Sequence, residues 1–374
     1  MSFSARRKRA AAAARAAGVD ALLVTHLPDV RWLCGFTGSN AALVVRGGGA
    51  ARLFTDGRYT AQAKAEAAGV RVTIATGPAA VAACEWMAGE GKTGAGVRRC
   101  GFDASQTTVA GLKAMRRAVP AKVRRGMFVS VGALIAKLRE VKDSDEIQKM
   151  RAAAAMGCRL FEGIFDHILP GGTEAEVALA LEYKARVAGA EAMSFETIVA
   201  SGVRSSLPHG RATRAKLPRR GFVTLDFGVV LDGYCSDMTR TVHLGRASAE
   251  ERRVYEAVLE AQEAGVAAVR EGVVTSDVDE AARGVLRRAG LDKWFTHSTG
   301  HGVGLEIHEG PRLARKQPGA RKAAAETLKA GMVVTIEPGV YMPGKFGVRI
   351  EDTVLVTKTG CEILTPCTKA WIEL

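Results

Sequence analysis

The sequence predicts an α+β protein of two domains, a smaller N-terminal α/β domain over residues 1–135 and a larger domain over residues 136–374. Short apolar runs typical of strands alternate with helical segments through the first 130 residues. A capping box, Asp143 with Glu146, then opens a long helix after a linker. From there the order helix, helix, hairpin occurs twice, which predicts an internal pseudo-twofold duplication.

The N-terminal domain begins with a basic helix that Gly18 ends. Four apolar runs predict strands, at 21–25, 41–45, 51–55 and 70–74, and three segments predict helices, at 60–68, 79–88 and 108–118. The basic start has no acid before Asp20 and could also serve as an organellar presequence. It lacks the apolar core of a secretory signal, so a first helix is the favoured interpretation.

The composition is that of an ordinary soluble globular protein, with 47% hydrophobic and 25% charged residues in a chain of 374. No apolar run approaches the roughly 20 residues that cross a bilayer, so no membrane segment is expected. Seven cysteines without a CxxC pair indicate free thiols in a reducing compartment, which predicts a cytoplasmic protein.

The formal net charge of +14 raises the question of an anionic partner. The basic clusters lie at 6–9, 98–99, 122–125, 211–220 and 312–322. They are scattered, aromatic residues make up only 6% of the chain, and no nucleic-acid-binding motif is present. A solvated basic surface is therefore favoured over a specific nucleic-acid partner, while nonspecific polyanion binding at low salt stays open.

The larger domain is expected to have two matching halves. The first half has a helix at 145–168, a helix capped by Thr173 with Glu176, and a hairpin at 222–242. The second half has a helix at 249–270 opened by Ser248 with Glu251, a helix opened by Ser276 with Asp279 and ended by Gly290, and a hairpin at 333–356 turning through 343–345.

The first hairpin brings two carboxylates onto one face. Asp232-Gly233 is a strong signal for a two-residue turn, and this turn places Asp226 opposite Thr239. Asp237 then shares the face of Asp226. Two solvated aspartates on an outer face are the alternative, but their apolar neighbours favour a buried sheet. Buried carboxylates repel each other unless a cation lies between them, which indicates a metal site.

The second hairpin carries Glu337 and Glu351 almost directly opposite each other. If the two halves face each other, four carboxylates meet in one cleft. Between the hairpins, His297, His301 and His308 fall in a glycine-rich stretch. A lone histidine is more often structural than functional, but three beside converging carboxylates favour a site.

A loop histidine and two strings in the histidine-rich region also bear on the site. His209 lies on a loop before the first hairpin, where catalytic groups are often carried. The GxGxG string at 300–304 lacks the strand–helix context of a dinucleotide loop. His308-Glu309 lacks the second histidine of a zincin motif.

Several strings carry a family resemblance. LDFGVVLDGYCSDMTRT, GHGVGLEIHEGP, VVTIEPGVY and GVRIEDT resemble the pita-bread metallopeptidases, the family of methionine aminopeptidase, aminopeptidase P and prolidase. FTGSNA and LFTDGRYT resemble the creatinase-type N-terminal domain. The resemblance implies a C-terminal pita-bread fold after a creatinase-type domain, and it is close to the short bacterial Xaa-Pro aminopeptidases.

The resemblance implies a ligand set for two divalent metal ions. Asp226 would bind one ion bidentately, Asp237 and Glu351 would bridge, and His301 with Glu337 would complete the second site. An oxygen-rich site with one imidazole favours Mn²⁺, while Co²⁺, Zn²⁺ and Fe²⁺ are also compatible.

The resemblance also implies hydrolysis of the bond between an N-terminal residue and a following proline, by a hydroxide that bridges the ions. Glu337 would act as general acid and base. His209, His297 and His308 would bind substrate and stabilise the tetrahedral intermediate. Arg349 matches the arginine of the proline-specific branch and would act in catalysis and substrate binding. Arg312 would bind a substrate carboxylate as in prolidases. A homodimer is also implied.

Two other functions stay open. A prolidase acting only on Xaa-Pro dipeptides is kept open by Arg312, whereas LFTDGRYT favours the aminopeptidase. A noncatalytic binding protein on the same fold is the alternative outside the class, and the presence of all five ligand types argues against it. TDGRYT at 55–60 is read as a turn or a dimer contact rather than a part of the site.

Overall fold

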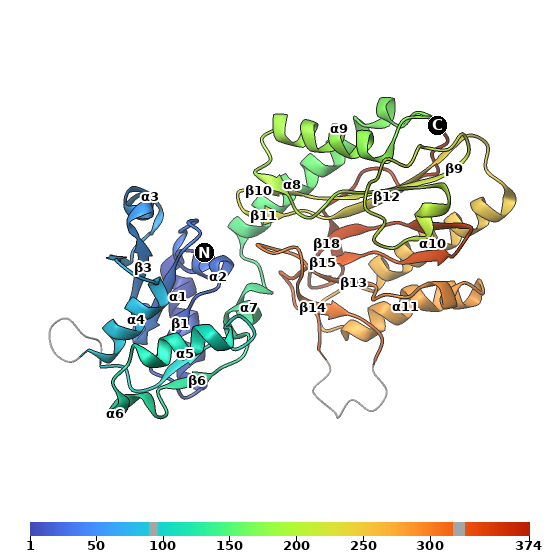
Figure 1. The fold of residues 1–374 in the computed structure, drawn as a ribbon. Helices are drawn as coiled ribbons and strands as arrows, with labels where there is room; N and C mark the ends of the chain where they lie inside the picture. The colour runs from blue at the N-terminus through green and yellow to red at the C-terminus, as the bar shows by residue number, and fades with distance from the viewer. Residues whose placement is uncertain (90–95, 317–325) are drawn as a thin grey trace. The chain divides into compact units, whose positions relative to one another are not determined.

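A computed structural model describes residues 1–89, 96–316 and 326–374 of the chain (Figure 1). The chain divides into two compact units, Met1–Arg139 and Glu140–Leu374. Within the described ranges, no helix combines the length and the apolar content needed to cross a membrane. The basic run predicted at 312–322 lies outside the described residues from 317 onward.

In the first unit, the strands that the structure describes form one six-stranded sheet. Its strand order is β4 (Arg71–Ala75), β3 (Ala51–Asp56), β2 (Ala42–Arg46), β1 (Ala21–Val24), β5 (Cys100–Phe102) and β6 (Phe128–Ser130). β1, β2 and β3 pair antiparallel, and the remaining pairs are parallel. The four predicted strands are confirmed. β5 and β6 were missed because three residues are too few for a periodic pattern.

Seven α-helices accompany this sheet in the described part of the unit. They are α1 (Phe3–Ala16), α2 (Leu27–Cys34), α3 (Thr60–Glu66), α4 (Ala79–Ala88), α5 (Val109–Arg117), α6 (Ala121–Arg124) and α7 (Leu134–Arg139). The predicted first helix is confirmed, with Gly18 at φ 73° just beyond its end. α3, α4 and α5 match the other three predicted helices.

The second unit has helices on both sides of its strands, as predicted for an α+β fold with two matching halves (Figure 1). α8 (Ser144–Glu162) and α9 (Glu174–Val187) precede the first hairpin, and α10 (Ala249–Ala268) and α11 (Thr275–Arg288) precede the second. The core of the first half includes Phe161, Leu181 and Phe227, each fully buried. Burying such a side chain contributes roughly 1.5–3 kcal/mol.

The strands described in this unit form four sheets. Three strands pair in the order β12 (Met238–Leu244), β9 (Gly221–Phe227), β8 (Ile198–Ser201), and three in the order β11 (Tyr234–Cys235), β10 (Val229–Leu231), β7 (Ala192–Met193). Five pair in the order β14 (Glu309–Leu313), β13 (Gly300–Gly302), β15 (Val333–Ile336), β18 (Asp352–Val356), β19 (Cys361–Ile363), and β16 (Gly339–Met342) pairs with β17 (Phe346–Arg349).

Helix starts follow the sequence more closely than helix ends. The capping boxes at Asp143, Thr173 and Ser248 all form as predicted. The predicted helix at 145–168 is wrong at its end, because α8 stops at Glu162 and Gly163 caps it. Ile164 and Ile168 are buried beyond that point, so the apolar spacing continues although the helix does not.

The capping box predicted at Ser276 with Asp279 is wrong. α11 begins at Thr275, and its N-cap residue, Val274, supplies no side-chain hydrogen bond. The Asp279 carboxylate is buried and pairs with Arg283, with Nε–Oδ2 at 2.8 Å. It also accepts hydrogen bonds from the backbone N–H and the hydroxyl of Thr299. Asp279 therefore ties α11 to the segment that leads into β13.

The first hairpin has the predicted turn and register. Asp232 and Gly233 both have positive φ, 48° and 79°, as a type I′ turn requires. Leu231 pairs with Tyr234 across the turn, and the same register continues to Asp226 opposite Thr239.

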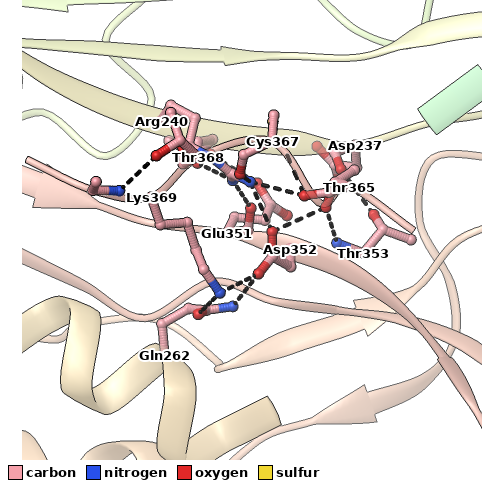
Figure 2. Close-up of polar contacts among 12 residues, drawn as sticks. Asp237, Arg240, Gln262, Glu351, Asp352, Thr353, Thr365, Cys367, Thr368 and Lys369 are labelled. Atoms are coloured by element: carbon pink, nitrogen blue, oxygen red, sulfur yellow. Dashed lines mark hydrogen bonds and ion pairs between the residues drawn. The ribbon is translucent and has the colours of Figure 1, made fainter. Parts of the chain in front are cut away.

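A buried arginine joins the two hairpins and the C-terminal segment (Figure 2). Arg240, on β12, is 2% exposed. Its guanidinium donates to the Asp352 carboxylate at 2.9 Å and to the backbone carbonyl of Glu351 at 2.5 Å. It also donates to three carbonyls of the C-terminal segment, those of Thr365, Cys367 and Thr368.

We expect Arg240→Met to destabilise the protein by about 3–5 kcal/mol, because it leaves a buried carboxylate and several carbonyls without their donor. Equilibrium unfolding in urea measures the change. Arg246→Met, at an exposed position just after the same hairpin, is the matched control and should stay within about 0.5 kcal/mol of wild type. Equal stability of the two variants would contradict this role for Arg240.

Candidate functional site

A cleft of about 640 Å³ lies in the second unit. All ten side chains that the sequence predicts for the site line it: His209, Asp226, Asp237, His297, His301, His308, Arg312, Glu337, Arg349 and Glu351. They come from segments spread over more than 140 positions of the chain. The fold therefore brings together every group that the motifs singled out.

The first hairpin supplies two carboxylates to the floor of this cleft. Asp226 lies on β9, and Asp237 precedes β12 and faces Gly228 in the hairpin register. A Cβ atom at Gly228 would lie 1.8 Å from the carbonyl oxygen of Ser236. Only glycine allows the two strands to approach this closely beside Asp237.

The second hairpin supplies two more carboxylates, in the predicted arrangement. Ile336 pairs with Asp352, and Gly339 pairs with Arg349, so the same register places Glu337 and Glu351 opposite each other. A bridge between Thr239 and Glu351 joins this hairpin to the first. The Thr239 hydroxyl donates to Glu351 Oε2 at 2.7 Å.

His301 reaches the same point from β13. Cβ atoms at Gly300 and Gly302 would lie within 2.0 Å of the backbone oxygens of Thr335 and Gly310, so both positions require glycine. His301 Nδ1 lies 3.0 Å from the Gly302 carbonyl oxygen, which can only accept, so Nδ1 carries the proton.

The other ring nitrogen of His301 points at the carboxylates. Nε2 lies 3.7 Å from Asp237 Oδ2 and 3.5 Å from Glu337 Oε1. Burial lowers the pKa of the His301 imidazole to about 4, so the ring is neutral at neutral pH. A neutral imidazole with its lone pair on Nε2 is the form that binds a metal ion.

The floor of the cleft concentrates negative charge out of water. Asp226, Asp237 and Glu351 each offer an oxygen within 4.8 Å of the others. Burial raises the pKa values of Asp237 and Glu351 well above their usual range, and the neighbouring carboxylates raise them further. Burial also raises the pKa of Glu337 to about 8.

The donor set fits divalent cations. Asp226 Oδ1 is buried and has no hydrogen-bond partner, which is costly unless an ion satisfies it. Four carboxylates and one imidazole are ligands that suit Mn²⁺, Fe²⁺, Co²⁺ or Zn²⁺. Asp226, Asp237, His301, Glu337 and Glu351 are the residues that could hold such ions.

Arg349 forms several hydrogen bonds and an ion pair at the floor of the cleft. Its side chain is 4% exposed, and Nη2 lies 2.5 Å from Asp226 Oδ2. The guanidinium also donates to the Tyr341 hydroxyl at 2.6 Å, to Thr239 Oγ1 and to the Pro208 carbonyl. These bonds orient Asp226 and leave little of the guanidinium facing the open cleft.

Tyr341 is a site residue that sequence reasoning missed. Its hydroxyl lies 2.9 Å from His297 Nε2, and His297 Nδ1 lies 2.8 Å from the Ser298 carbonyl oxygen. The carbonyl fixes the proton on Nδ1, so the Tyr341 hydroxyl donates to Nε2 while accepting from Arg349. Tyr341 ends the string VVTIEPGVY, and this position was the available signal.

The mouth of the cleft carries exposed side chains. His209 and His308 are exposed, and burial of part of its ring lowers the pKa of His308. The His308 ring lies 4.5 Å from the ring of His301, between centroids. Arg312, also exposed, pairs with His301 in the register of β14 and β13.

A second missed residue, Glu174, holds the loop that carries His209. Glu174 is fully buried at the start of α9. Its carboxylate accepts from the N–H and hydroxyl of Ser201, from Arg204, and from the N–H and hydroxyl of Thr213. Both ends of the loop are thereby fixed by one carboxylate. No motif pointed to this role, because it depends on contacts some 30 to 40 positions away in the chain.

The raised carboxyl pKa values predict how the stability of the metal-free protein depends on pH. A carboxyl with a folded pKa above its unfolded value of about 4 binds more protons in the folded state. Stability should therefore fall as pH rises from about 4 toward the pKa of about 8 of Glu337. Unfolding of chelator-treated protein at pH 5 and at pH 8 measures this loss.

Asp237→Asn should reduce this pH-dependent loss, because it removes one of the crowded charges. Asp166→Asn, at an exposed position, is the control and should keep the wild-type pH dependence. A loss that is the same in wild type and Asp237→Asn would show that the carboxylates are not crowded as described.

Comparisons with known proteins agree with this architecture. Residues 6–141 match the Creatinase/Prolidase N-terminal domain, and residues 148–358 match metallopeptidase family M24. The uncharacterized peptidase YqhT of Bacillus subtilis (strain 168) is 38% identical over 96% of both chains.

Two solved structures resemble the chain over nearly its whole length. An Xaa-Pro dipeptidase from Bacillus anthracis has a TM-score of 0.92 at 36% identity, covering 100% of both chains. An X-Pro aminopeptidase from Thermotoga maritima MSB8 has a TM-score of 0.85 at 33% identity, covering 97% of this chain and 100% of that one. The chain belongs to metallopeptidase family M24, with a creatinase/prolidase-type N-terminal domain.

Proposed function

We propose that the protein is an Xaa-Pro aminopeptidase, which removes an N-terminal residue that precedes proline and depends on two divalent metal ions. The observation that carries the proposal is the meeting of four carboxylates and the His301 imidazole in one cleft. The two similar structures, an Xaa-Pro dipeptidase and an X-Pro aminopeptidase, support an Xaa-Pro substrate and are compatible with either activity.

Each ligand has a proposed place. Asp226 would hold one ion, which would give its unpartnered Oδ1 a role. His301 and Glu337, whose Nε2 and Oε1 lie 3.5 Å apart, would hold the second ion. Asp237 and Glu351 would contribute to both sites. Mn²⁺ is the favoured ion because oxygen ligands dominate.

The ions supply Lewis acidity and lower the pKa of water toward neutrality. Glu337 holds the nucleophile's proton and delivers it to the leaving proline nitrogen, as a general acid and base. A proline nitrogen carries no N–H in the peptide bond, so it must be protonated to leave.

The exposed imidazoles at the mouth are proposed to bind the substrate. His209 and His308 line the cleft and, as hydrogen-bond donors, can stabilise an oxyanion. His297 takes part through Tyr341 and Arg349, to which its ring is linked. Arg349 acts by orienting Asp226.

The dipeptidase remains the nearest rival, and Arg312 is the observation that favours it. Arg312 is exposed at the mouth of the cleft and could bind the carboxylate of an Xaa-Pro dipeptide. In the first unit, Asp56 and Arg58 of the TDGRYT string pair with each other at 2.9 Å, as expected of a turn. A homodimer and a cytoplasmic location are part of the proposal, and the seven free cysteines fit a reducing compartment.

Asp237→Ala tests the metal mechanism directly. Because Asp237 is proposed to bridge, the variant should lose bound metal and Xaa-Pro hydrolysis together. Elemental analysis of the purified protein and a peptide hydrolysis assay measure the two losses. Equal hydrolysis by both forms would remove the metal mechanism, whereas absence of hydrolysis by the wild type as well would favour the noncatalytic alternative.

His308→Ala should lower kcat by about 10²–10³-fold, the usual loss for one donor to a developing oxyanion. Its thermal midpoint should match wild type, because the side chain is exposed. His167→Ala, exposed outside the cleft, is the matched control and should leave kcat unchanged. A His308→Ala protein that fails to fold would make this residue structural.

The length of the substrate separates the two peptidase activities. The proposal expects an Xaa-Pro-Yaa tripeptide to be cleaved at least as well as the Xaa-Pro dipeptide. Arg312→Ala should then change kcat/KM for both peptides alike. A strict dipeptidase would instead cleave only the dipeptide and lose about tenfold or more in kcat/KM in this variant.

A further inference from the structure

The net positive charge of the chain comes from its first unit. Residues 1–139 contain 22 Lys and Arg against seven Asp and Glu, whereas residues 140–374 contain 31 against 32. The proposed peptidase site lies in the second unit and uses none of this charge. An excess of this size attracts anions to the first unit.

Three arginines gather on one face of the sheet in this unit. Arg52 on β3 is the direct partner of Arg71 on the parallel strand β4. Val44 on β2 is the partner of Arg52, and Arg46 lies two residues further on the same strand, so it shares that face. Like charges directly opposite on neighbouring strands are destabilising.

These arginines surround a hollow with an aromatic wall. The hollow has a volume of about 500 Å³ and is lined by Arg46, Arg52, Arg71 and Trp86 together with small and apolar residues. Trp86 comes from α4, and the guanidinium carbons of Arg52 and Arg46 lie 4.9 Å and 5.9 Å from its ring centroid. Stacking on an indole orients a guanidinium while leaving its edge free to donate.

Among the described residues that line this hollow, none carries a carboxylate. Among the residues that the structure describes, none of the three guanidinium groups forms an ion pair, and Arg52 donates only to the hydroxyl of Thr73, at 2.9 Å. Elsewhere in the unit, arginines do find carboxylates, as Arg139 does with Asp29 at 2.6 Å. Most guanidinium N–H groups around the hollow are therefore available to hydrogen-bond a ligand.

We propose that this hollow is a binding site for a small ligand that carries two or more phosphate charges. Guanidinium groups match phosphate oxygens in geometry and charge. An anion bound between the three arginines would also offset the repulsion between their positive charges. The volume lies within the range of small-molecule sites, and the Trp86 indole in the wall of the hollow can contact a ring attached to the phosphates beside the guanidinium groups. The site is independent of the peptidase chemistry.

Isothermal calorimetry on the full-length protein tests the site, with pyrophosphate, ADP and a short single-stranded oligouridylate as probes. Wild type should bind pyrophosphate or ADP at physiological salt. The double variant Arg52→Gln/Arg71→Gln should bind at least about tenfold more weakly, because it removes charge-assisted hydrogen bonds to the phosphate oxygens. The control, Arg116→Gln/Arg117→Gln on α5, removes the same charge from exposed positions and should bind as wild type does.

The three probes distinguish the sources of phosphate. Tighter binding of ADP than of pyrophosphate supports a nucleotide-like ligand on Trp86, and Trp86→Ala should remove that difference. Equal binding of both supports a site for the phosphates alone. Binding of the oligouridylate only, with a steep salt dependence and equal weakening in both double variants, would overturn the proposal in favour of a diffuse basic surface. Absence of binding to every probe would also overturn it.

Discussion

The mutual repulsion of buried carboxylates is the constraint on which the second unit depends. Two hairpins from different halves of the unit meet at the bridge between Thr239 and Glu351. Their meeting forces Asp226, Asp237 and Glu351 into contact range of one another, away from water. Without bound cations, this arrangement lowers the free energy of unfolding, because apolar residues would fill the same space with a smaller desolvation penalty. The buried carboxylates therefore indicate a role in binding cations.

The surroundings of the carboxylates limit their movement. Arg240 donates a hydrogen bond to the backbone carbonyl of Glu351, and Arg349 forms an ion pair with the Asp226 carboxylate. Glycines at 228, 300 and 302 let backbone pass where a Cβ atom would collide. The floor of the cleft is therefore rigid and preorganised, whereas His209 and His308 at the mouth stay exposed.

Local signals in the sequence predicted the parts of the site that local geometry fixes. Asp232-Gly233 set the register of the first hairpin, and the register placed Asp226 opposite Thr239. Glu337 and Glu351 followed from the second turn in the same way. Individual side-chain contacts between segments far apart in the chain could not be predicted, because no local pattern signals them. Tyr341 and Glu174 act through partners far away in the chain, and Asp279 resembled a cap while serving as a buried ion-pair partner.

Anomalous diffraction from crystals grown with Mn²⁺ tests the central claim most directly. Two anomalous peaks in the cleft, roughly 3.5–4 Å apart, are expected, with Asp237 and Glu351 between them and His301 on one. A cleft without peaks, or a single ion bound away from these five side chains, would contradict the account.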